Sequence, residues 1–195
     1  MGKVMTNLSM SLDGFIAGPN DDVQQVFAWT MNGDTDIPVQ SGRLVLKVSP
    51  QSAQLIRDSL KTTGAMVAGR RMFDLAKAWG GNPPFAPCFI VTHTAPQEWG
   101  EEGSPFTFVT DGVESAIRQA KHAAWDKNVA VATASITQQC LEAGLLDEIH
   151  IDLVPVLLGD GIRLFDDLDA KPIELERIRV IEAPGVTHLS FRVVK

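Results

Sequence analysis

Gly69 is followed by two adjacent arginines, Arg70 and Arg71, and preceded by a short apolar run. This order predicts a buried strand, a tight turn and then a helix whose first turn carries both guanidinium groups. The first backbone N–H groups of a helix have no partner within it, and the helix dipole disfavours cations there unless an anion joins them. The turn is therefore a candidate phosphate site, although two solvated arginines at an ordinary turn explain it equally well.

Two further turns carry groups suited to a nucleotide. Thr92 and His93 end a second apolar run and offer a hydroxyl and an imidazole for a 2′-phosphate or an adenine edge. Thr133 and Ser135 begin a predicted helix whose backbone N–H groups could take a pyrophosphate. For each turn alone, a local capping hydrogen bond is the favoured explanation. The sequence contains no GxGxxG, so the standard dinucleotide fingerprint is absent.

Asp13 is the best candidate for an acid. It lies beside Gly14 in a turn after a predicted strand, where a carboxylate can point into a cleft. Hydride transfer to a C=N or C=O centre needs a proton delivered nearby, and a partly buried carboxylate can supply or relay it. From the turn alone, an aspartate that caps its own backbone is the favoured explanation.

Other residue patterns argue against other kinds of site. The four histidines show no HxxxH or HxH spacing, which argues against a metal site. No serine stands in a GxSxG elbow, which disfavours an acyl-transfer hydrolase. Trp29 could stack on a flat substrate ring if the early helix borders the cleft, although packing in the core is favoured.

The composition predicts one globular domain over residues 1–195. The net charge of -7 argues against a nucleic-acid surface. We expect no membrane span and no signal peptide, because no apolar run is long enough and the first residues read directly as a strand. Cys88 and Cys140 stand in no CxxC pattern, so we expect both in the core of a cytoplasmic protein.

Strands alternate with helices along the middle of the chain. Strands are expected over residues 3–9, 15–17, 66–68, 88–92, 106–109, 129–132, 149–154, 173–181 and 186–194. Helices are expected from residue 21 to about 31, and over 49–62, 70–79, 113–125 and 133–143. Residues 32–38 are expected to form a polar turn, and 42–49 either a strand or an ordered loop.

This alternation predicts an α/β fold with one mixed, mostly parallel sheet, helices on both faces and a C-terminal antiparallel hairpin. Ligands of such sheets bind at the carboxyl ends of the strands. We therefore expect the turns after Ala68, Thr92 and Ala132 to lie along one rim.

Three motifs, in this order, resemble those of the dihydrofolate-reductase-like superfamily, and most closely the reductase domain of the bifunctional riboflavin-biosynthesis deaminase-reductase. They are SLDGFIA at 11–17, VAGRRMFD at 67–74 and LLDEIHIDLVPVLLGDGIRLF at 145–165. The resemblance covers nearly the whole chain, and the last motif is the most specific. It implies a dihydrofolate-reductase-like fold, often a homodimer, and NADPH-dependent hydride transfer to a small pterin- or pyrimidine-ribosylamine-like substrate, as in 5-amino-6-(5-phosphoribosylamino)uracil reductase.

The resemblance also implies a role for each matching residue. Asp13 would be the catalytic residue beside the nicotinamide and the substrate. Substrate contacts would come from Asp13, Leu158, Gly159 and Gly161, with Trp29 added from the argument above. Cofactor contacts would come from Gly69, Arg70, Arg71, Met72, Thr92, His93, Ala132, Thr133, Ala134, Ser135 and Ile136. The arginine forks favour NADPH over NADH, because NADPH carries one more phosphate.

Two features depart from the family pattern. Ala132 and Thr133 stand where the family usually has two glycines, and a Cβ atom at each position would crowd a close approach of the cofactor. The acidic residue of true dihydrofolate reductases would fall near Ala53, while Asp58 is out of register. The HxE…CxxC signature of the deaminase half is absent. The alternatives are a nucleotide- or pterin-binding protein without catalysis, or an interaction module that binds no nucleotide.

Overall fold

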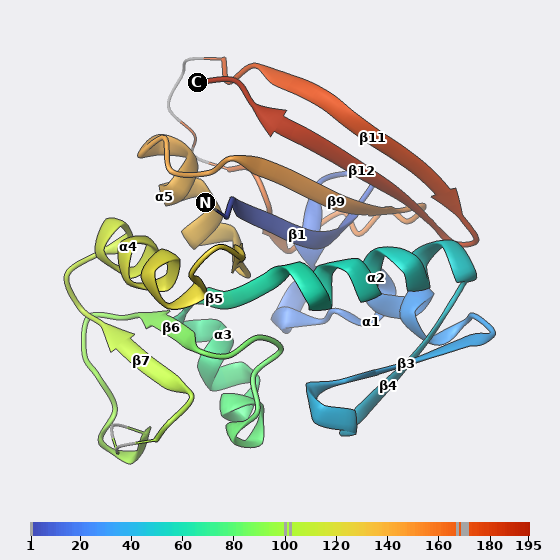
Figure 1. Cartoon of the computed structure of the whole chain (residues 1–195). Coiled ribbons are helices and arrows are strands. Elements are labelled where there is room, and N and C mark those ends of the chain that lie inside the picture. The colour runs from blue at the N-terminus through green and yellow to red at the C-terminus, as the bar shows by residue number, and fades with distance from the viewer. Residues whose placement is uncertain (1, 100, 102, 167, 169–171) are drawn as a thin grey trace.

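The computed structural model describes residues 2–99, 101, 103–166, 168 and 172–195. Its main sheet has eight strands in the order β11-β12-β9-β1-β8-β5-β6-β7 (Figure 1). The strands are β1 (Val4–Ser11), β5 (Thr63–Gly69), β6 (Cys88–Val91), β7 (Phe106–Val109), β8 (Asn128–Val131), β9 (Glu148–Val154), β11 (Leu175–Ala183) and β12 (Val186–Val193). The six strands from β9 to β7 are parallel, and β12 and β11 add an antiparallel edge. The predicted fold class is confirmed.

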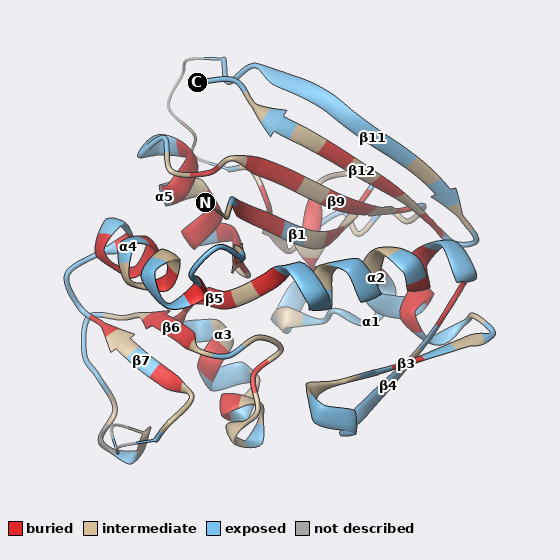
Figure 2. Cartoon of the chain, viewed as in Figure 1, coloured by how far each residue is buried: buried red, intermediate tan, exposed pale blue. Residues whose placement is uncertain are grey.

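Helices pack on both faces of this sheet. They are α1 (Gln24–Phe27), α2 (Pro50–Thr62), α3 (Arg70–Leu75), α4 (Val113–Ala124) and α5 (Ala134–Glu142). Alternate residues of β5 belong to different cores, as the period of two in a strand requires. Ala65 and Val67 pack with residues of α4 and α5, whereas Met66 and Ala68 pack with Phe73 of α3. β5 is accordingly buried along most of its length (Figure 2).

Residues 32–38 differ from the prediction, whereas one of the two alternatives for residues 42–49, a strand, is confirmed. The segment predicted as a polar turn contains β3 (Thr35–Val39), which pairs antiparallel with β4 (Leu44–Val48). This hairpin stands apart from the main sheet (Figure 1). The prediction was wrong because Asp36 and Pro38 are poor strand residues, and a two-stranded edge tolerates them better than a central strand does.

The helix predicted from residue 21 to about 31 was also wrong. Its place is taken by α1 and by 3₁₀ turns over Pro19–Asp21 and Ala28–Met31. The single apolar face expected for it does not form. Val26 is buried, but Phe27 and Met31 are 43% and 55% exposed. The 3.6-residue period no longer applies once the segment is broken into separate turns.

A buried chain of hydrogen bonds joins the start of α2 to the sheet. Ser49 caps α2, as the sequence predicted, and its Oγ accepts from the N–H of Ser52 at 3.2 Å. The Ser52 hydroxyl lies 2.8 Å from Nε2 of His188, and the Nδ1 atom of the same ring lies 2.6 Å from a carboxylate oxygen of Asp152. The order of groups is that of a serine hydrolase, but Ser52 is 1% exposed and has no access to a substrate. The chain of bonds therefore fixes α2 against β9 and β12.

Several expectations concern membrane spans, metal sites, the cysteines, the oligomeric state and the location rather than the fold. Within the described residues, no helix is both long and apolar enough to cross a membrane, and no three His, Cys, Asp or Glu side chains are placed to hold a metal ion. Cys88 and Cys140 are buried, and burial raises the pKa of each thiol to about 12. The edge strand β11 is largely exposed. The homodimer and the cytoplasmic location stay predictions.

Candidate functional site

The three turns singled out in the sequence lie at neighbouring strand ends. In the parallel pairs, Val67 of β5 stands opposite Val131 of β8, and Gly69 stands opposite Val91 of β6. The chain leaves all three strands at the same edge of the sheet, so the turns that follow them share one rim. This is the arrangement expected for a ligand that spans several strand ends.

On this rim, Gly69 lies beside the start of α5. A Cβ atom on Gly69 would lie 3.4 Å from Oγ1 of Thr133, 3.6 Å from Cγ1 of Ile136 and 3.7 Å from Oγ of Ser135. The glycine thus leaves open a space that any other residue would fill. Two chain segments far apart in sequence meet here around a small gap lined by hydroxyl groups.

Thr133 is the N-cap residue of α5, but it does not act as a cap. Its side chain makes no capping hydrogen bond, and its Oγ1 is buried without any hydrogen-bond partner in the described structure. A simple helix cap was the favoured explanation from sequence, and the geometry does not agree with it. A buried hydroxyl without a partner costs about 1–3 kcal/mol unless a ligand or water satisfies it.

The first turn of α5 supplies further donors beside this hydroxyl. Ala134 and Ile136 are buried, whereas Ser135 between them is exposed. The first N–H groups of an α-helix lack intrahelical acceptors and favour anions. The backbone N–H of Ala132 is already used, because it donates to the carbonyl of Val67 at 3.0 Å. The residues present therefore fit a pyrophosphate group held mainly by backbone donors.

The second turn, at Thr92, satisfies its own hydrogen bonds. Thr92 Oγ1 donates to the carbonyl of Thr94 at 3.0 Å and accepts from its N–H at 3.3 Å. Arg70 of α3 also binds this turn. Its Nη1 donates to the carbonyl of Thr94 at 3.0 Å, and its Nε donates to a carboxylate oxygen of Asp74 at 2.8 Å. His93 beside them is exposed and Met72 of α3 is half-buried. The turn is thus held by its own hydrogen bonds and by Arg70, and the imidazole of His93 is exposed beside it.

Asp13 is held by donors from a distant loop. Its carboxylate accepts from the N–H of Leu158 at 3.1 Å, from the N–H of Gly159 at 2.7 Å and from Oγ of Ser11 at 2.6 Å. The structure therefore brings Asp13, Leu158 and Gly159 together. The Ser11 hydroxyl, followed by the two backbone donors, lowers the pKa of Asp13 to about 2, although partial burial acts in the opposite direction. At neutral pH this carboxylate carries no proton to donate.

Gly161 lies in the same loop and packs closely against Ala17, in the segment that follows Asp13. A Cβ atom on Gly161 would lie 2.0 Å from the carbonyl oxygen of Ala17, and its φ of +135° is one that other residues rarely adopt. Arg163 then reaches back, with Nη1 donating to the Asp13 carbonyl at 3.1 Å and the guanidinium 4.3 Å from the centre of the Phe15 ring. Sequence reasoning did not single out Arg163, although it lies inside the most specific motif.

Trp29 has the contacts of a core residue. It is 7% exposed, its indole N–H donates to Oγ of Ser9 at 3.0 Å, and its ring meets the edge of His188 at 5.3 Å between centroids. Packing was the favoured explanation from sequence, and it accounts for these contacts. Little of the indole is left to stack on a substrate.

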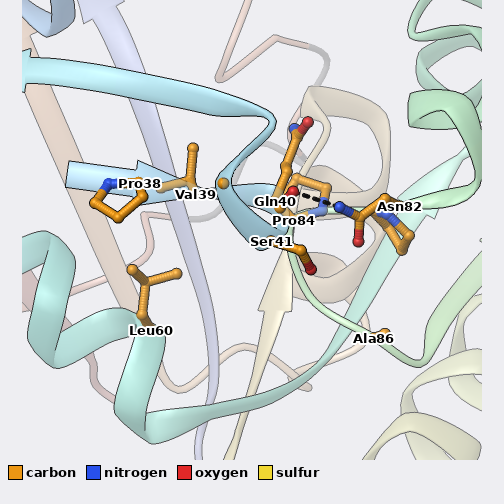
Figure 3. A pocket seen from close by; sticks show the side chains of 10 residues that line it. Pro38, Val39, Gln40, Ser41, Leu60, Asn82, Pro84 and Ala86 are labelled. Atoms are coloured by element: carbon orange, nitrogen blue, oxygen red, sulfur yellow. Dashed lines mark hydrogen bonds between the residues drawn. The ribbon is translucent and has the colours of Figure 1, made fainter.

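A hollow of about 450 Å³ lies elsewhere, between the tip of the β3–β4 hairpin, Leu60 of α2 and a proline-rich loop (Figure 3). Asn82 Nδ2 donates to the carbonyl of Gln40 and holds the loop to the hairpin. None of the predicted site residues lines this hollow. It is therefore separate from the rim described above.

Solved structures define the class of fold. The chain aligns over 99% of its length with 99% of a candidate riboflavin biosynthesis protein from Shewanella sp. PV-4, at 18% identity and a TM-score of 0.76. It aligns over 99% with 57% of a deaminase/5-amino-6-(5-phosphoribosylamino)uracil reductase from Thermotoga maritima, at 12% identity and a TM-score of 0.66. It also aligns over its full length with 98% of a dihydrofolate reductase from Enterococcus faecalis complexed with NADP(H), at 12% identity and a TM-score of 0.58. The fold is that of the dihydrofolate-reductase-like proteins.

The family follows from the sequence itself. The model of the RibD C-terminal domain family matches residues 2–187. The chain belongs to this family, as the motifs at 11–17, 67–74 and 145–165 implied. No curated protein matches it.

Proposed function

We propose that this protein is an NADPH-dependent reductase that transfers a hydride to a small heterocyclic substrate of the pyrimidine-ribosylamine or pterin type. The observation that carries the proposal is the buried Thr133 hydroxyl without a partner, which faces the gap at Gly69 on the rim of strand ends. Membership of the RibD C-terminal domain family supports the same conclusion.

Each part of the site has a role in this proposal. The start of α5 and the Gly69 turn hold the pyrophosphate, and Arg70 and Arg71 supply positive charge beside it. Bound NADPH supplies the hydride. His93, exposed next to Thr92, contacts the adenosine end. Asp13 acts as an acceptor that orients an N–H or O–H group of the substrate, because its low pKa excludes proton donation near pH 7.

The structure disfavours dihydrofolate as the substrate of this site. At the position where dihydrofolate reductases carry an acid, Ala53 is completely buried in the cluster beneath the hairpin. The nearest acid on α2, Asp58, is exposed and accepts a hydrogen bond from Gln54. No carboxylate of α2 is thus available to a pterin ring, so we expect weak or no dihydrofolate reduction.

The test is steady-state oxidation of NADPH with 5-amino-6-(5-phosphoribosylamino)uracil as acceptor. The wild-type protein is expected to turn over, and Asp13→Asn is expected to lower kcat/KM by about 100-fold through loss of substrate orientation. Asp58→Asn is the matched control, because that carboxylate is exposed on α2, and it should leave the rate unchanged. Full turnover in Asp13→Asn would remove Asp13 from the mechanism.

The second candidate is a protein that binds a nucleotide or pterin without catalysis. It is motivated by Ala132 and Thr133, whose Cβ atoms stand where the family pattern has glycines. This candidate gains support if NADPH binds but is not oxidised with any pyrimidine or pterin acceptor. An interaction module remains a third candidate, and it predicts no nucleotide binding at all.

A further inference from the structure

An ion pair joins the start of α3 to a turn that lies 50 residues earlier in the sequence. Nη2 of Arg71 lies 2.8 and 2.9 Å from the two carboxylate oxygens of Asp21. The Asp21 side chain is 19% exposed and that of Arg71 is 72% exposed. The carboxylate is thus mostly covered, and it contacts the exposed guanidinium of Arg71 on α3. Sequence reasoning placed Asp21 at the start of a helix and gave no sign of this contact.

The segment that carries Asp21 is backbone-strained. Asn20 and Asp21 have φ values of +59° and +61°, a region that non-glycine residues rarely adopt. Such residues cost of order 1–3 kcal/mol each and persist only where surrounding contacts hold them. Local support comes from Gly18, whose N–H donates to the carbonyl of Asp22 at 2.7 Å. The pair with Arg71 is the side-chain contact that ties the tip of this turn to α3.

The two arginines of α3 are used differently. Arg70 has a partner on its own helix, Asp74, and a backbone carbonyl at Thr94. The partner of Arg71 instead belongs to the strained turn, which follows the Asp13 loop directly through β2 (Phe15–Ala17). Asp21 takes the N–H donors of Nη2, so a phosphate that binds Arg71 through this nitrogen must displace the carboxylate from it.

We propose that Asp21 sets the affinity of this site for anionic ligands. Its carboxylate occupies Nη2 of Arg71, a donor that a phosphate of the dinucleotide takes on binding. This inference rests on the proposed function for the identity of the ligand, but the competition itself requires only a phosphate group. Binding then replaces the Asp21 contact, and the turn over Pro19–Asp21 loses its side-chain attachment to α3.

Calorimetric titration with NADPH tests the competition. Asp21→Asn is expected to bind about 5-fold more tightly than wild type, because the amide is a weak competitor for a guanidinium. Arg71→Gln is expected to bind about 10-fold more weakly, and adding Asp21→Asn to it should give no further change, since the two residues act through one contact. Asp22→Asn is the matched control: this neighbouring carboxylate accepts from the N–H of Gln24 and should leave the affinity unchanged.

A parallel titration with inorganic pyrophosphate separates the two proposals. Tighter pyrophosphate binding by Asp21→Asn, with no binding of NADPH by any variant, would uphold the competition and reject the reductase. NADPH binding that is equal or weaker in Asp21→Asn would overturn the role of Asp21 and leave the reductase intact. If neither ligand binds to any variant, Arg71 does not bind phosphate and the inference also fails.

Discussion

Replacing Gly161 by alanine is expected to lower the free energy of unfolding by roughly 3 kcal/mol. The new methyl carbon would lie 2.0 Å from the carbonyl oxygen of Ala17, and backbone cannot move aside as a flexible side chain can. The φ of +135° adds strain for any residue with a Cβ atom. Because the same loop donates to Asp13 through Leu158 and Gly159, the variant should also lose turnover. Urea unfolding and NADPH oxidation measure the two effects.

Gly159→Ala is the control for this prediction. Gly159 also has a positive φ, of +76°, but a Cβ atom there would meet nothing within 4 Å. The free energy of unfolding of Gly159→Ala should therefore fall by only about 1 kcal/mol, the usual cost of a left-handed residue. Equal losses of unfolding free energy in the two variants would mean that the close contact between Gly161 and Ala17 does not stabilise the loop.

Replacing His188 by alanine is expected to lower the free energy of unfolding by about 3–5 kcal/mol. The ring joins Asp152 to Ser52, so its removal takes the imidazole from a buried carboxylate and leaves the Ser52 hydroxyl with only its contact to Ser49. The edge contact with Trp29 is lost as well. Denaturant unfolding, followed by tryptophan fluorescence, gives the difference directly.

Ser190→Ala is the matched variant for His188. Ser190 lies two residues further along β12, on the same face, and is equally buried, but its Oγ makes only a long contact of 3.3 Å with Nδ1 of His150. Its loss should cost about 1 kcal/mol. If His188→Ala costs no more than Ser190→Ala, the bonds from Asp152 to Ser52 do not anchor α2.

The rim of strand ends was predictable because parallel pairing is a regular consequence of alternating strands and helices. Once residues 66–68, 88–92 and 129–132 are identified as strands, their following turns must share one edge. The family resemblance, rather than the composition, predicted that Asp13 and the loop at Leu158 lie at the same site. The hydrogen bonds between them give that association a physical basis.

Other features depend on contacts between residues that are distant in sequence, which no local sequence pattern indicates. The β3 strand contains Asp36 and Pro38, and only its pairing with β4 makes it a strand. The partner of Arg71 is 50 residues away, in a turn whose strain is invisible in the sequence. Thr133 is an ordinary N-cap by residue type, and only the three-dimensional structure shows that its hydroxyl is buried without a partner. Each of these features is set by tertiary packing.

We propose that the rim binds a nicotinamide dinucleotide that carries the extra phosphate of NADPH. Thermal unfolding with NADPH, NADH and NADP⁺, each in large excess, tests it most directly. A ligand at a hundredfold excess over its Kd stabilises the folded protein by about 2.7 kcal/mol. For a chain of this length that raises the midpoint by about 5–10 °C. We expect such a shift with NADPH and a smaller one with NADH. No shift with any of the three would mean that Ala132 and Thr133 close the site, and the reductase assignment would be rejected.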